Sequence, residues 1–352
     1  MLVIATFDII SVLNRYANKE KIMKENKIKI LLDTDVGDDI DDALAIALGL
    51  SSEEVEFVGI TTVFKNTNDR ARIAKQLVKN NPYKIPVYAG HCGGIEIPTD
   101  PYSGYPNGIT DEDGKQHLCQ FTDDLKSAEY APENDEEGFY GEAAIDFIID
   151  SCYKHGKELT VLAIGPLTNI AKVIKKDPEA LNHAKRVVIM GGKFYDCEAE
   201  WNIICDVEAA ALLFSGAVRN LECIGLDVTL KTQLTEAETA IASNYKGKAY
   251  SEYASRLVRI WCERNHSRPT LHDPLAFFYC IFPDIVTTEK MRVTVATKGE
   301  ANGVTMNISR WDNWRLNRVE PGFSRYAEVT VAKEVDRERF VAEFLKRVFD
   351  KR

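Results

Sequence analysis

The sequence predicts an α/β protein: one open, largely parallel sheet with helices on both faces. Short apolar runs rich in β-branched residues alternate with segments of helical periodicity along most of the 352 residues. That pattern is typical of strands buried on both faces of a parallel sheet. The chain has no internal repeat, no low-complexity tract and no shift of composition that would mark a linker. We therefore expect a single domain.

The elements follow one another in a regular order from residue 27. The predicted strands are 27–32, 55–63, 85–89, 159–164, 186–190 and 221–226. The predicted helices are 42–50, 68–79, 141–155, a helix that ends near 176, and 207–214. In folds of this kind ligands bind beyond the carboxyl ends of the strands, in the loops that lead into helices. Functional residues are therefore expected in those loops.

Three segments depart from this alternation. Residues 90–138 are rich in Gly, Pro and acidic residues and too long for a plain connection. Residues 232–270 are polar and helical with several aromatics. We expect both segments to be excursions from the sheet that lie near the functional site, within a catalytic domain that spans 25–352. Residues 1–24 are expected to form a helical or disordered extension.

The composition indicates which binding partners and which cellular compartment to expect. A formal net charge of −10 argues against nucleic acid, because a phosphate backbone binds clustered Lys and Arg. The eight cysteines are scattered without a C-x-x-C pair, as in a protein of a reducing compartment. The apolar stretch 1–13 contains Asp8, lacks a basic region and is too short to span a bilayer. We expect a cytoplasmic protein without a membrane partner, and a cleaved signal is the alternative for this stretch.

An unusual density of carboxylates follows the first predicted strand. Residues 31–44 read LLDTDVGDDIDDAL, with six Asp in ten residues and no Lys or Arg between them. Helix capping and the helix dipole explain one or two of these, and like charges otherwise repel. Such a cluster indicates a hard divalent cation, Ca²⁺ or Mg²⁺. The spacing excludes an EF-hand, because Asp38 and Leu44 stand where that loop needs Gly and Glu.

These residues resemble a known family. Asp-Thr-Asp-x-Gly at 33–37, followed by Asp-Asp-Ala-Leu at 41–44, is similar to the signature of the nucleoside hydrolases, the inosine–uridine-preferring N-ribohydrolases. Further stretches resemble family segments in the expected order: TTVFKN at 61–66, AIGPLTNIA at 163–171, VIMGG at 188–192, EWN with DVEAA at 200–210, and LHDPLA at 271–276. The resemblance runs from about residue 27 to the C-terminus.

The resemblance implies hydrolysis of the N-glycosidic bond of ribonucleosides to free base and ribose, with Ca²⁺ as the cofactor. The implied metal ligands are Asp33, Asp35, Asp42, Asp273 and the backbone carbonyl of Ile164. The implied substrate contacts are Asp41, Asn66, Glu200 and Asn202 on the ribose and Met190 beneath it. Among aromatics, the candidates to stack on the base are Trp201, Tyr250, Tyr253 and Trp261. A homodimer or homotetramer that acts in nucleoside catabolism and salvage is also expected.

The chemistry agrees with these residue types. Cleavage passes through an oxocarbenium-like sugar cation, so the site must hold ribose, activate a water and neutralise the departing base. The resemblance implies Asp35 as the general base, a role that suits it because a neighbouring cation keeps its carboxylate ionised. It also implies His272, which directly precedes Asp273, as the general acid. His266 is the alternative acid.

Some features of the sequence depart from the family pattern. The family spacing is Gly-x-Asp-Asp, whereas three residues separate Gly37 from Asp41 here. Asp39 is therefore an alternative for the ribose or metal role. A family Asn between Met190 and Glu200 has no counterpart, so the base preference is not assigned. The alternative functions are a non-catalytic ribose- or nucleoside-binding protein and a haloacid-dehalogenase-type phosphatase with Asp33 as its nucleophile.

Overall fold

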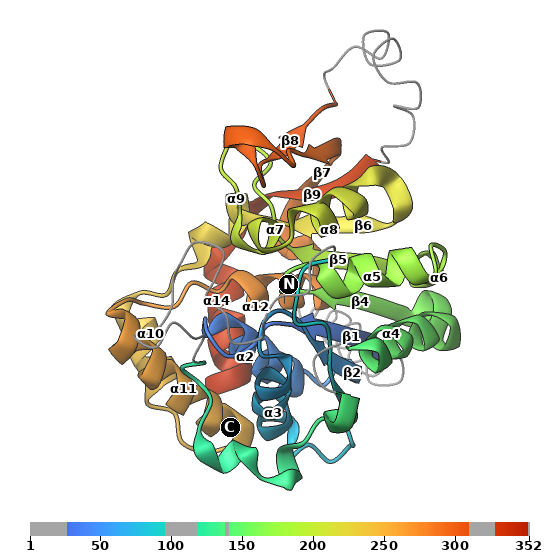
Figure 1. The fold of residues 1–352 in the computed structure, drawn as a ribbon. Coiled ribbons are helices and arrows are strands. Elements are labelled where there is room, and N and C mark those ends of the chain that lie inside the picture. Colours follow the sequence, from blue (N-terminus) through green and yellow to red (C-terminus); the bar gives the residue numbers. More distant parts are fainter. Residues whose placement is uncertain (1–26, 96–117, 138–140, 310–327, 351–352) are drawn as a thin grey trace, which may run out of the picture.

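The computed structural model describes residues 27–95, 118–137, 141–309 and 328–350 (Figure 1). The expected extension 1–24 lies outside these ranges, as does much of the excursion 90–138. Within the described ranges, no helix combines the length and apolarity needed to cross a bilayer.

The described strands form one nine-stranded sheet in the order β3-β2-β1-β4-β5-β6-β9-β7-β8. They are β1 Ile28–Thr34, β2 Val55–Thr62, β3 Val87–Ala89, β4 Leu159–Ala163, β5 Arg186–Met190, β6 Leu221–Ile224, β7 Val286–Val295, β8 Thr305–Asn307 and β9 Glu328–Val335. All pairs from β3 to β9 are parallel, and β7 runs antiparallel to both β9 and β8. The predicted fold class is confirmed, although the sequence did not indicate the C-terminal strands β7, β8 and β9.

Helices cover both faces of this sheet (Figure 1). The longer ones are α2 Asp41–Leu50, α3 Thr67–Val78, α4 Glu142–His155, α5 Thr168–Lys176, α10 Glu236–Ser243, α11 Ala249–Asn265, α12 His272–Ile281 and α14 Arg337–Phe349. The shorter ones are α6 Ala180–His183, α7 Trp201–Cys205, α8 Val207–Leu212 and α9 Leu226–Thr229. The predicted helix 207–214 is α8, which continues into a π-helical turn at Leu213–Ala217.

Two hydrophobic cores hold the layers together, one on each face. Ile30 and Leu32 of β1 point into the core formed with α2, α12 and α14, and Leu31 points into the core formed with α4 and α5. This alternation follows from the two-residue period of a strand. Because both faces are buried, each strand is apolar along its length, as the sequence pattern indicated.

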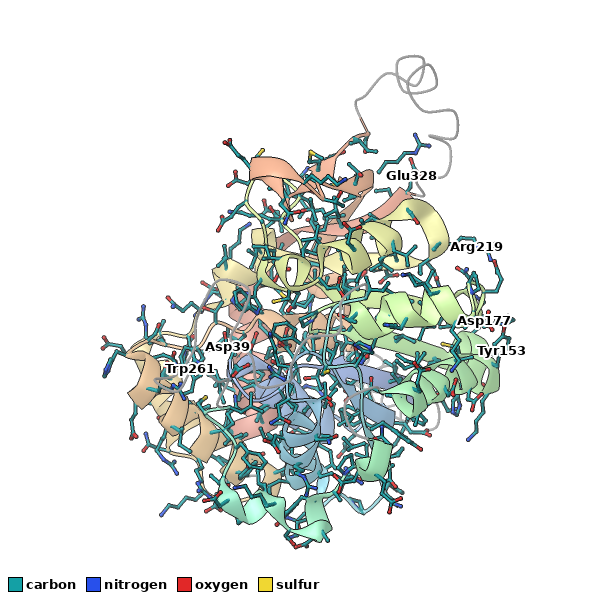
Figure 2. The ribbon with its side chains drawn as sticks, viewed as in Figure 1. Asp39, Tyr153, Asp177, Arg219, Trp261 and Glu328 are labelled. Carbon is teal, nitrogen blue, oxygen red and sulfur yellow. The ribbon has the colours of Figure 1, made fainter. Side chains whose placement is uncertain are left out.

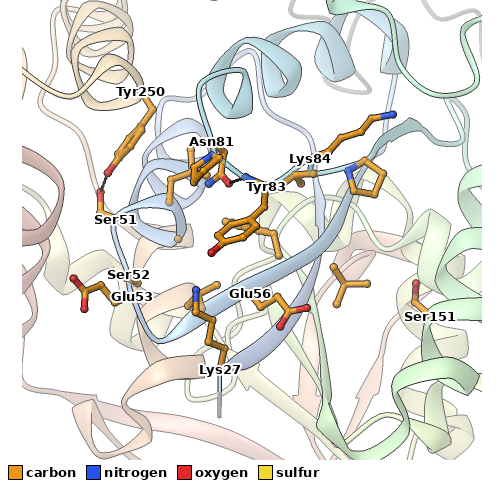
Figure 3. Close-up of a pocket in the computed structure, with 18 of the residues that line it drawn as sticks. Lys27, Ser51, Ser52, Glu53, Glu56, Asn81, Tyr83, Lys84, Ser151 and Tyr250 are labelled. Carbon is orange, nitrogen blue, oxygen red and sulfur yellow. Dashed lines mark hydrogen bonds between the residues drawn. The ribbon is translucent and has the colours of Figure 1, made fainter. Parts of the chain in front are cut away.

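The edge of the sheet where the strands begin contains a cavity of about 1030 Å³ (Figure 3). Lys27, Glu56, Tyr83 and Lys154 line it with mixed charge. Tyr250 also lies there, with its hydroxyl 3.5 Å from Ser51 Oγ. No residue expected to bind metal or ribose lines this cavity. The structure therefore places Tyr250 away from the expected base-stacking position.

Candidate active site

Three acidic side chains meet where α2 and α12 begin. Asp41 and Asp42 occupy the first turn of α2, and Asp273 occupies the first turn of α12. All three are buried, and they offer carboxylate oxygens within 4.8 Å of one another. The backbone N–H of Asp273 donates to Asp41 Oδ2 at 3.3 Å. Because helix N-termini carry partial positive charge, the two helix ends favour negative charge at this point.

Asp33 reaches the same edge from the carboxyl end of β1 and is fully buried. Its Oδ1 accepts hydrogen bonds from the Thr61 hydroxyl at 2.6 Å and from Asn169 Nδ2 at 2.7 Å. Its Oδ2 is buried and has no hydrogen-bond partner among the described residues. A buried oxygen of this kind requires an explanation, and a bound cation is a direct one.

Asp35 and Asp42 are joined through the backbone that follows β1. The Thr34 hydroxyl donates to Asp42 Oδ1, and the Asp35 N–H donates to the same oxygen at 3.2 Å. Gly165, after β4, leaves room for Asp35, since a Cβ there would lie 2.7 Å from Asp35 Oδ1. The loops after β1 and β4 therefore approach each other closely.

Burial dominates the electrostatics of these carboxylates. It raises the pKa of Asp33 and of Asp35 to about 7. Burial first, and then the neighbouring carboxylates, raise the pKa values of Asp41, Asp42 and Asp273 well above the usual range. A divalent cation would offset this repulsion and displace the protons. The oxygen-only donor set, with the unpaired Asp33 Oδ2, fits a hard cation such as Ca²⁺ or Mg²⁺.

A buried arginine holds the lengthened acidic loop. Arg70 of α3 is fully buried and donates to the backbone carbonyls of Asp35 and Val36 and, at 2.8 Å, to that of Phe64. It also pairs with the Asp38 carboxylate at 2.7 Å. Asp38 is thereby directed to Arg70.

Asp39 lies outside the buried cluster. Asp39, labelled in Figure 2, is more exposed than Asp41 and Asp42. Its carboxylate accepts a hydrogen bond from the Ile40 N–H at 2.6 Å, and its charge contributes to the raised pKa values of Asp41 and Asp273. Asp41, in contrast, is buried beside Asp273. The geometry therefore favours Asp41 over Asp39 for a role at the metal or ribose.

Part of the excursion predicted at 90–138 packs on the acidic loop. Gln120 is buried, its N–H donates to the Gly37 carbonyl at 3.2 Å, and its side-chain amide donates to the Asp39 carbonyl. The Cys119 thiol donates to the Asp38 carbonyl at 3.2 Å. Burial raises the pKa of this thiol to about 11, and Arg264 at the end of α11 opposes the rise. Segments 118–120 and the end of α11 thus both lie near the loop.

Three of the expected substrate contacts, Glu200, Asn202 and Met190, lie at or beside α7. Glu200 is buried and accepts from the N–H groups of Asn202, Ile203 and Gly192 at 2.9–3.2 Å. Asn202 Nδ2 donates to the Ile164 carbonyl at 2.9 Å and to the carbonyl of buried Met190 at 3.1 Å. A carbonyl oxygen has two lone pairs, so Ile164 keeps one for a cation.

Asn66 and Trp201 stand at helix starts. Asn66 is buried and caps α3, accepting from the Asp69 N–H and donating to the Asp69 carboxylate at 2.6 Å. It follows Phe64 and Lys65, two residues in the left-handed region with φ of 71° and 58°. Left-handed backbone at residues other than Gly costs conformational free energy, and such residues are found most often at functional sites. Trp201 is partly exposed at the start of α7, and the substrate roles of Asn66 and Trp201 stay predictions.

His272 begins α12 and is partly buried. Burial lowers its pKa to about 4, so the ring is neutral at pH 7. Its Nδ1 lies 2.7 Å from Thr229 Oγ1. When the Thr229 hydroxyl is the donor, the ring proton resides on Nε2, which can then donate to another group.

The sequence analysis assigned no role to four residues that the structure places at this site. They are Thr61, Arg70, Asn169 and Thr229. Thr61 and Asn169 lie inside the stretches TTVFKN and AIGPLTNIA, so their positions carried a signal. Nothing local in the sequence distinguishes Arg70 or Thr229, because their partners are distant in the chain.

Comparisons with known proteins agree on one family. The sequence model of the family "Inosine-uridine preferring nucleoside hydrolase" matches residues 30–342. The chain is 30% identical to uridine nucleosidase 1 of Arabidopsis thaliana, over 90% of this chain and 92% of that protein. It is 29% identical to the inosine-uridine preferring nucleoside hydrolase of Crithidia fasciculata, over 92% of this chain and 98% of that protein. It is also similar to the solved purine-preferring ribonucleoside hydrolase from Gardnerella vaginalis, with a TM-score of 0.67, 30% identity and coverage of 91% and 98%.

We expect chelator-treated protein to lose stability as the pH rises from 5 to 8. Folded carboxyls with a pKa of about 7 keep protons that an unfolded chain, with Asp near 3.9, has released, so stability falls through this window. Added CaCl₂ should reverse the loss most strongly at pH 8. At roughly 2–4 °C per kcal/mol, the melting temperature should move by several degrees.

The control for this experiment is the exposed Asp123, paired with Lys126. Asp123→Asn should leave the pH profile of the melting temperature as in the parent, whereas Asp41→Asn should flatten it. A chelated protein equally stable across this range would contradict the electrostatic account.

Proposed function

We propose a function from one premise: the chain belongs to the inosine-uridine preferring nucleoside hydrolase family, whose model matches residues 30–342. As a member, it is a hydrolase of N-glycosyl compounds with ribonucleosides as substrates. The phosphatase alternative finds no support in these matches. Beyond the family, we propose Ca²⁺-dependent cleavage with Asp35 as general base and His272 as proton donor. The observation that carries this proposal is the buried carboxylate cluster with the unpaired Asp33 Oδ2.

The cation would be held by oxygen atoms from the first strands and from α12. The proposed ligands are Asp33, Asp35, Asp42, Asp273 and the Ile164 carbonyl. When bound, Ca²⁺ would bring a water and the ribose hydroxyls together and lower the pKa of that water. Five protein ligands leave room for such oxygens, because Ca²⁺ takes six to eight.

Asp35 is the proposed acceptor of the proton from the attacking water. It directly follows β1, held through its own N–H to Asp42 and through its carbonyl to Arg70. Without a cation its pKa is raised to about 7. An adjacent cation would lower that pKa and keep the carboxylate ionised. Asp35 would then accept a proton at neutral pH.

The remaining carboxylates act on the sugar. As C1′ gains positive charge, the buried Asp cluster provides preorganised negative charge around it, which stabilises the transition state. The side chains proposed to hold the ribose are Asp41, Asn66, Met190, Glu200 and Asn202, with Trp201 beside the base. Glu200 and Asn202 are held by hydrogen bonds to backbone groups, so they are rigid before substrate binds.

His272 is the proposed proton donor to the departing base. The ring is neutral at pH 7 because burial lowers its pKa to about 4. A hydrogen bond from the Thr229 hydroxyl to Nδ1 selects the tautomer with the proton on Nε2, from which the neutral ring would donate a hydrogen bond to the base. Transfer of the proton itself would proceed from the imidazolium, formed by uptake of a proton from water as negative charge develops on the leaving base. The relatives act by name on uridine, on inosine and uridine, or on purine nucleosides. Base preference is therefore best tested with a panel of ribonucleosides, with and without EDTA.

The assembly and location stay proposals. We propose a homodimer or homotetramer, a cytoplasmic location and a role in nucleoside catabolism and salvage. Analytical ultracentrifugation of purified protein tests the first of these.

Removing a proposed ligand should weaken calcium binding. We expect Asp35→Ala and Asp273→Ala to lower Ca²⁺ affinity by at least about tenfold, measured by calorimetry on chelator-treated protein. Asp123→Asn is the control, because that side chain is exposed and pairs with Lys126, and it should bind as the parent does. Parent-like binding by both alanine variants would show that the ligand assignment is wrong.

Asp41 should make the enzyme selective for ribose over 2′-deoxyribose. A site built to hydrogen-bond a hydroxyl rejects an analogue without it, by up to ~10⁴–10⁵-fold in kcat/KM. Asp41→Asn should lower kcat/KM on inosine more than on 2′-deoxyinosine, whereas Asp39→Asn should keep the parent's ratio. Near-equal turnover of both nucleosides by the parent would remove the basis for this role.

Substrates with different leaving groups test whether His272 is the general acid. General acid catalysis contributes ~10²–10⁴-fold, so His272→Ala should lose about that much on inosine or uridine. It should lose little on p-nitrophenyl riboside, whose leaving group departs as an anion. Asp35→Ala should lose activity on both substrates, because water activation is needed whatever leaves.

The control for this comparison is the alternative acid, exposed His266. His266→Ala should keep both activities. Equal losses on both substrates in His272→Ala would reassign that residue to positioning, and a substrate-selective loss in His266→Ala would make His266 the acid.

A further inference from the structure

We propose that Arg70 is a positioning residue that acts through Asp35. Its guanidinium binds the backbone of the acidic loop, residues 35–40, and so sets where Asp35 lies beside the buried carboxylate Asp42. The inference rests on the proposed function, because it assumes that Asp35 accepts a proton from the attacking water. Arg70 itself is not proposed to touch the substrate or the cation.

All three nitrogens of the Arg70 guanidinium make contacts. The side chain is fully buried and belongs to the start of α3. Nη1 donates to the carbonyl of Asp35 and, at 3.3 Å, to that of Val36. Nη2 pairs with the Asp38 carboxylate at 2.7 Å, and Nε donates to the Phe64 carbonyl at 2.8 Å. One side chain therefore holds the loop after β1 against the turn after β2.

Asp35 is the link between Arg70 and the buried carboxylate cluster. Its carbonyl accepts from Arg70, and its N–H donates to Asp42 Oδ1 at 3.2 Å. Asp42 is one of the three carboxylates that offer oxygens within 4.8 Å of one another. After burial, the charge of Asp35 is the next cause that raises the pKa of Asp42. The Asp35 side chain therefore lies near Asp42, and a shift of the loop would change the distance between them.

The turn after β2 gives the acidic loop a rigid partner. Phe64 and Lys65 both have left-handed backbone, with φ of 71° and 58°. Their N–H groups donate to the carbonyls of His91, at 3.0 Å, and of Cys92, at 2.7 Å. Strained backbone of this kind persists only where its surroundings fix it. The Phe64 carbonyl is therefore a fixed point to which Arg70 ties the loop.

A lysine at position 70 could not reproduce this arrangement. A guanidinium is planar and directs N–H groups from three nitrogens along fixed directions, whereas an ammonium has one nitrogen. Arg70→Lys therefore keeps the positive charge but loses most of these contacts. The variant separates the geometry of the guanidinium from its charge.

Asp38 allows a second, milder test. Its carboxylate pairs with Arg70 and is partly exposed. Asp38→Asn removes the negative charge but keeps an oxygen that can accept from Nη2, whereas Asp38→Ala removes both. The difference between these variants isolates the anchoring of the guanidinium from the electrostatic effect of Asp38. We expect Asp38→Ala to lose more activity than Asp38→Asn and less than Arg70→Lys.

Arg186 supplies a matched control. It is also buried, with Nη1 paired to the Glu222 carboxylate at 3.0 Å and Nη2 donating to the Cys280 carbonyl at 2.7 Å. It is the first residue of β5, at the edge of the sheet opposite the acidic loop. Arg186→Lys should therefore lower the melting temperature while keeping the kcat and the calcium affinity of the parent.

The experiment measures kcat at saturating CaCl₂, the Kd for Ca²⁺ by calorimetry and the melting temperature of the full-length variants. We expect Arg70→Lys to lower kcat by up to ~10²-fold, equally on inosine and on p-nitrophenyl riboside, because water activation is needed whatever leaves. It should also raise the Kd about tenfold through Asp42. In an Asp35→Ala background, Arg70→Lys should cost no further kcat, because residues that act as a unit are not additive.

The outcomes separate this inference from the proposed function. A lower melting temperature with the kcat and Kd of the parent would overturn the inference, as would a full additional loss in the Asp35→Ala background. If Asp35→Ala keeps the parent kcat, the proposed base is wrong and the inference falls with it. If Asp35→Ala loses activity and Arg70→Lys does not, only the inference falls. Should Arg70→Lys fail to fold, a greater loss in Asp38→Ala than in Asp38→Asn supports the inference, and equal activity overturns it.

Discussion

Mutual repulsion among carboxylates at one edge of the sheet is the constraint on which the rest of the structure depends. Asp41, Asp42 and Asp273 are buried together, and buried Asp33 and partly buried Asp35 lie at the same edge. Burial raises the pKa of each of the five. Such a cluster is stable only where positive charge or protons offset it. The N-termini of α2 and α12 supply a partial charge, and a divalent cation would supply the rest.

The parallel sheet brings these groups together from distant parts of the chain. Its strands end at a common edge, so Asp33 in β1, Thr61 in β2 and Ile164 after β4 become neighbours. α12 adds Asp273 from more than 200 residues away, through a hydrogen bond to Asp41. The rigid layers below, with an apolar core on each face, hold the edge in place. Binding groups are therefore positioned before substrate arrives.

The lengthened acidic loop needs its own supports. Arg70 holds the carbonyls of Asp35 and Val36 and pairs with Asp38, and Gln120 holds the carbonyls of Gly37 and Asp39. These contacts hold the backbone between β1 and α2 and direct the Asp38 carboxylate to Arg70. Asp41 and Asp42 can then occupy the first turn of α2. The longer loop therefore still leads to a helix that begins with Asp41 and Asp42.

Much of this protein was predictable from local patterns. Continuous apolar runs predicted six strands that the sheet contains, because strands buried on both faces must be apolar throughout. The crowded Asp residues indicated a cation, because such crowding is otherwise unfavourable. The C-terminal strand β7 was not indicated, since its exposed residues, including Thr287 and Thr288, interrupt the apolar pattern.

Tertiary structure alone decided which groups hold the predicted site residues. Asn169 lies 136 residues from Asp33 and Thr229 lies 43 residues from His272, so no spacing in the chain relates them. It also separated Asp41, buried in the cluster, from Asp39, exposed to solvent. The sequence by itself determined the kinds of side chain at the site and the fold that carries them. Their individual surroundings depend on contacts between distant segments, which form only when the sheet and its helices pack.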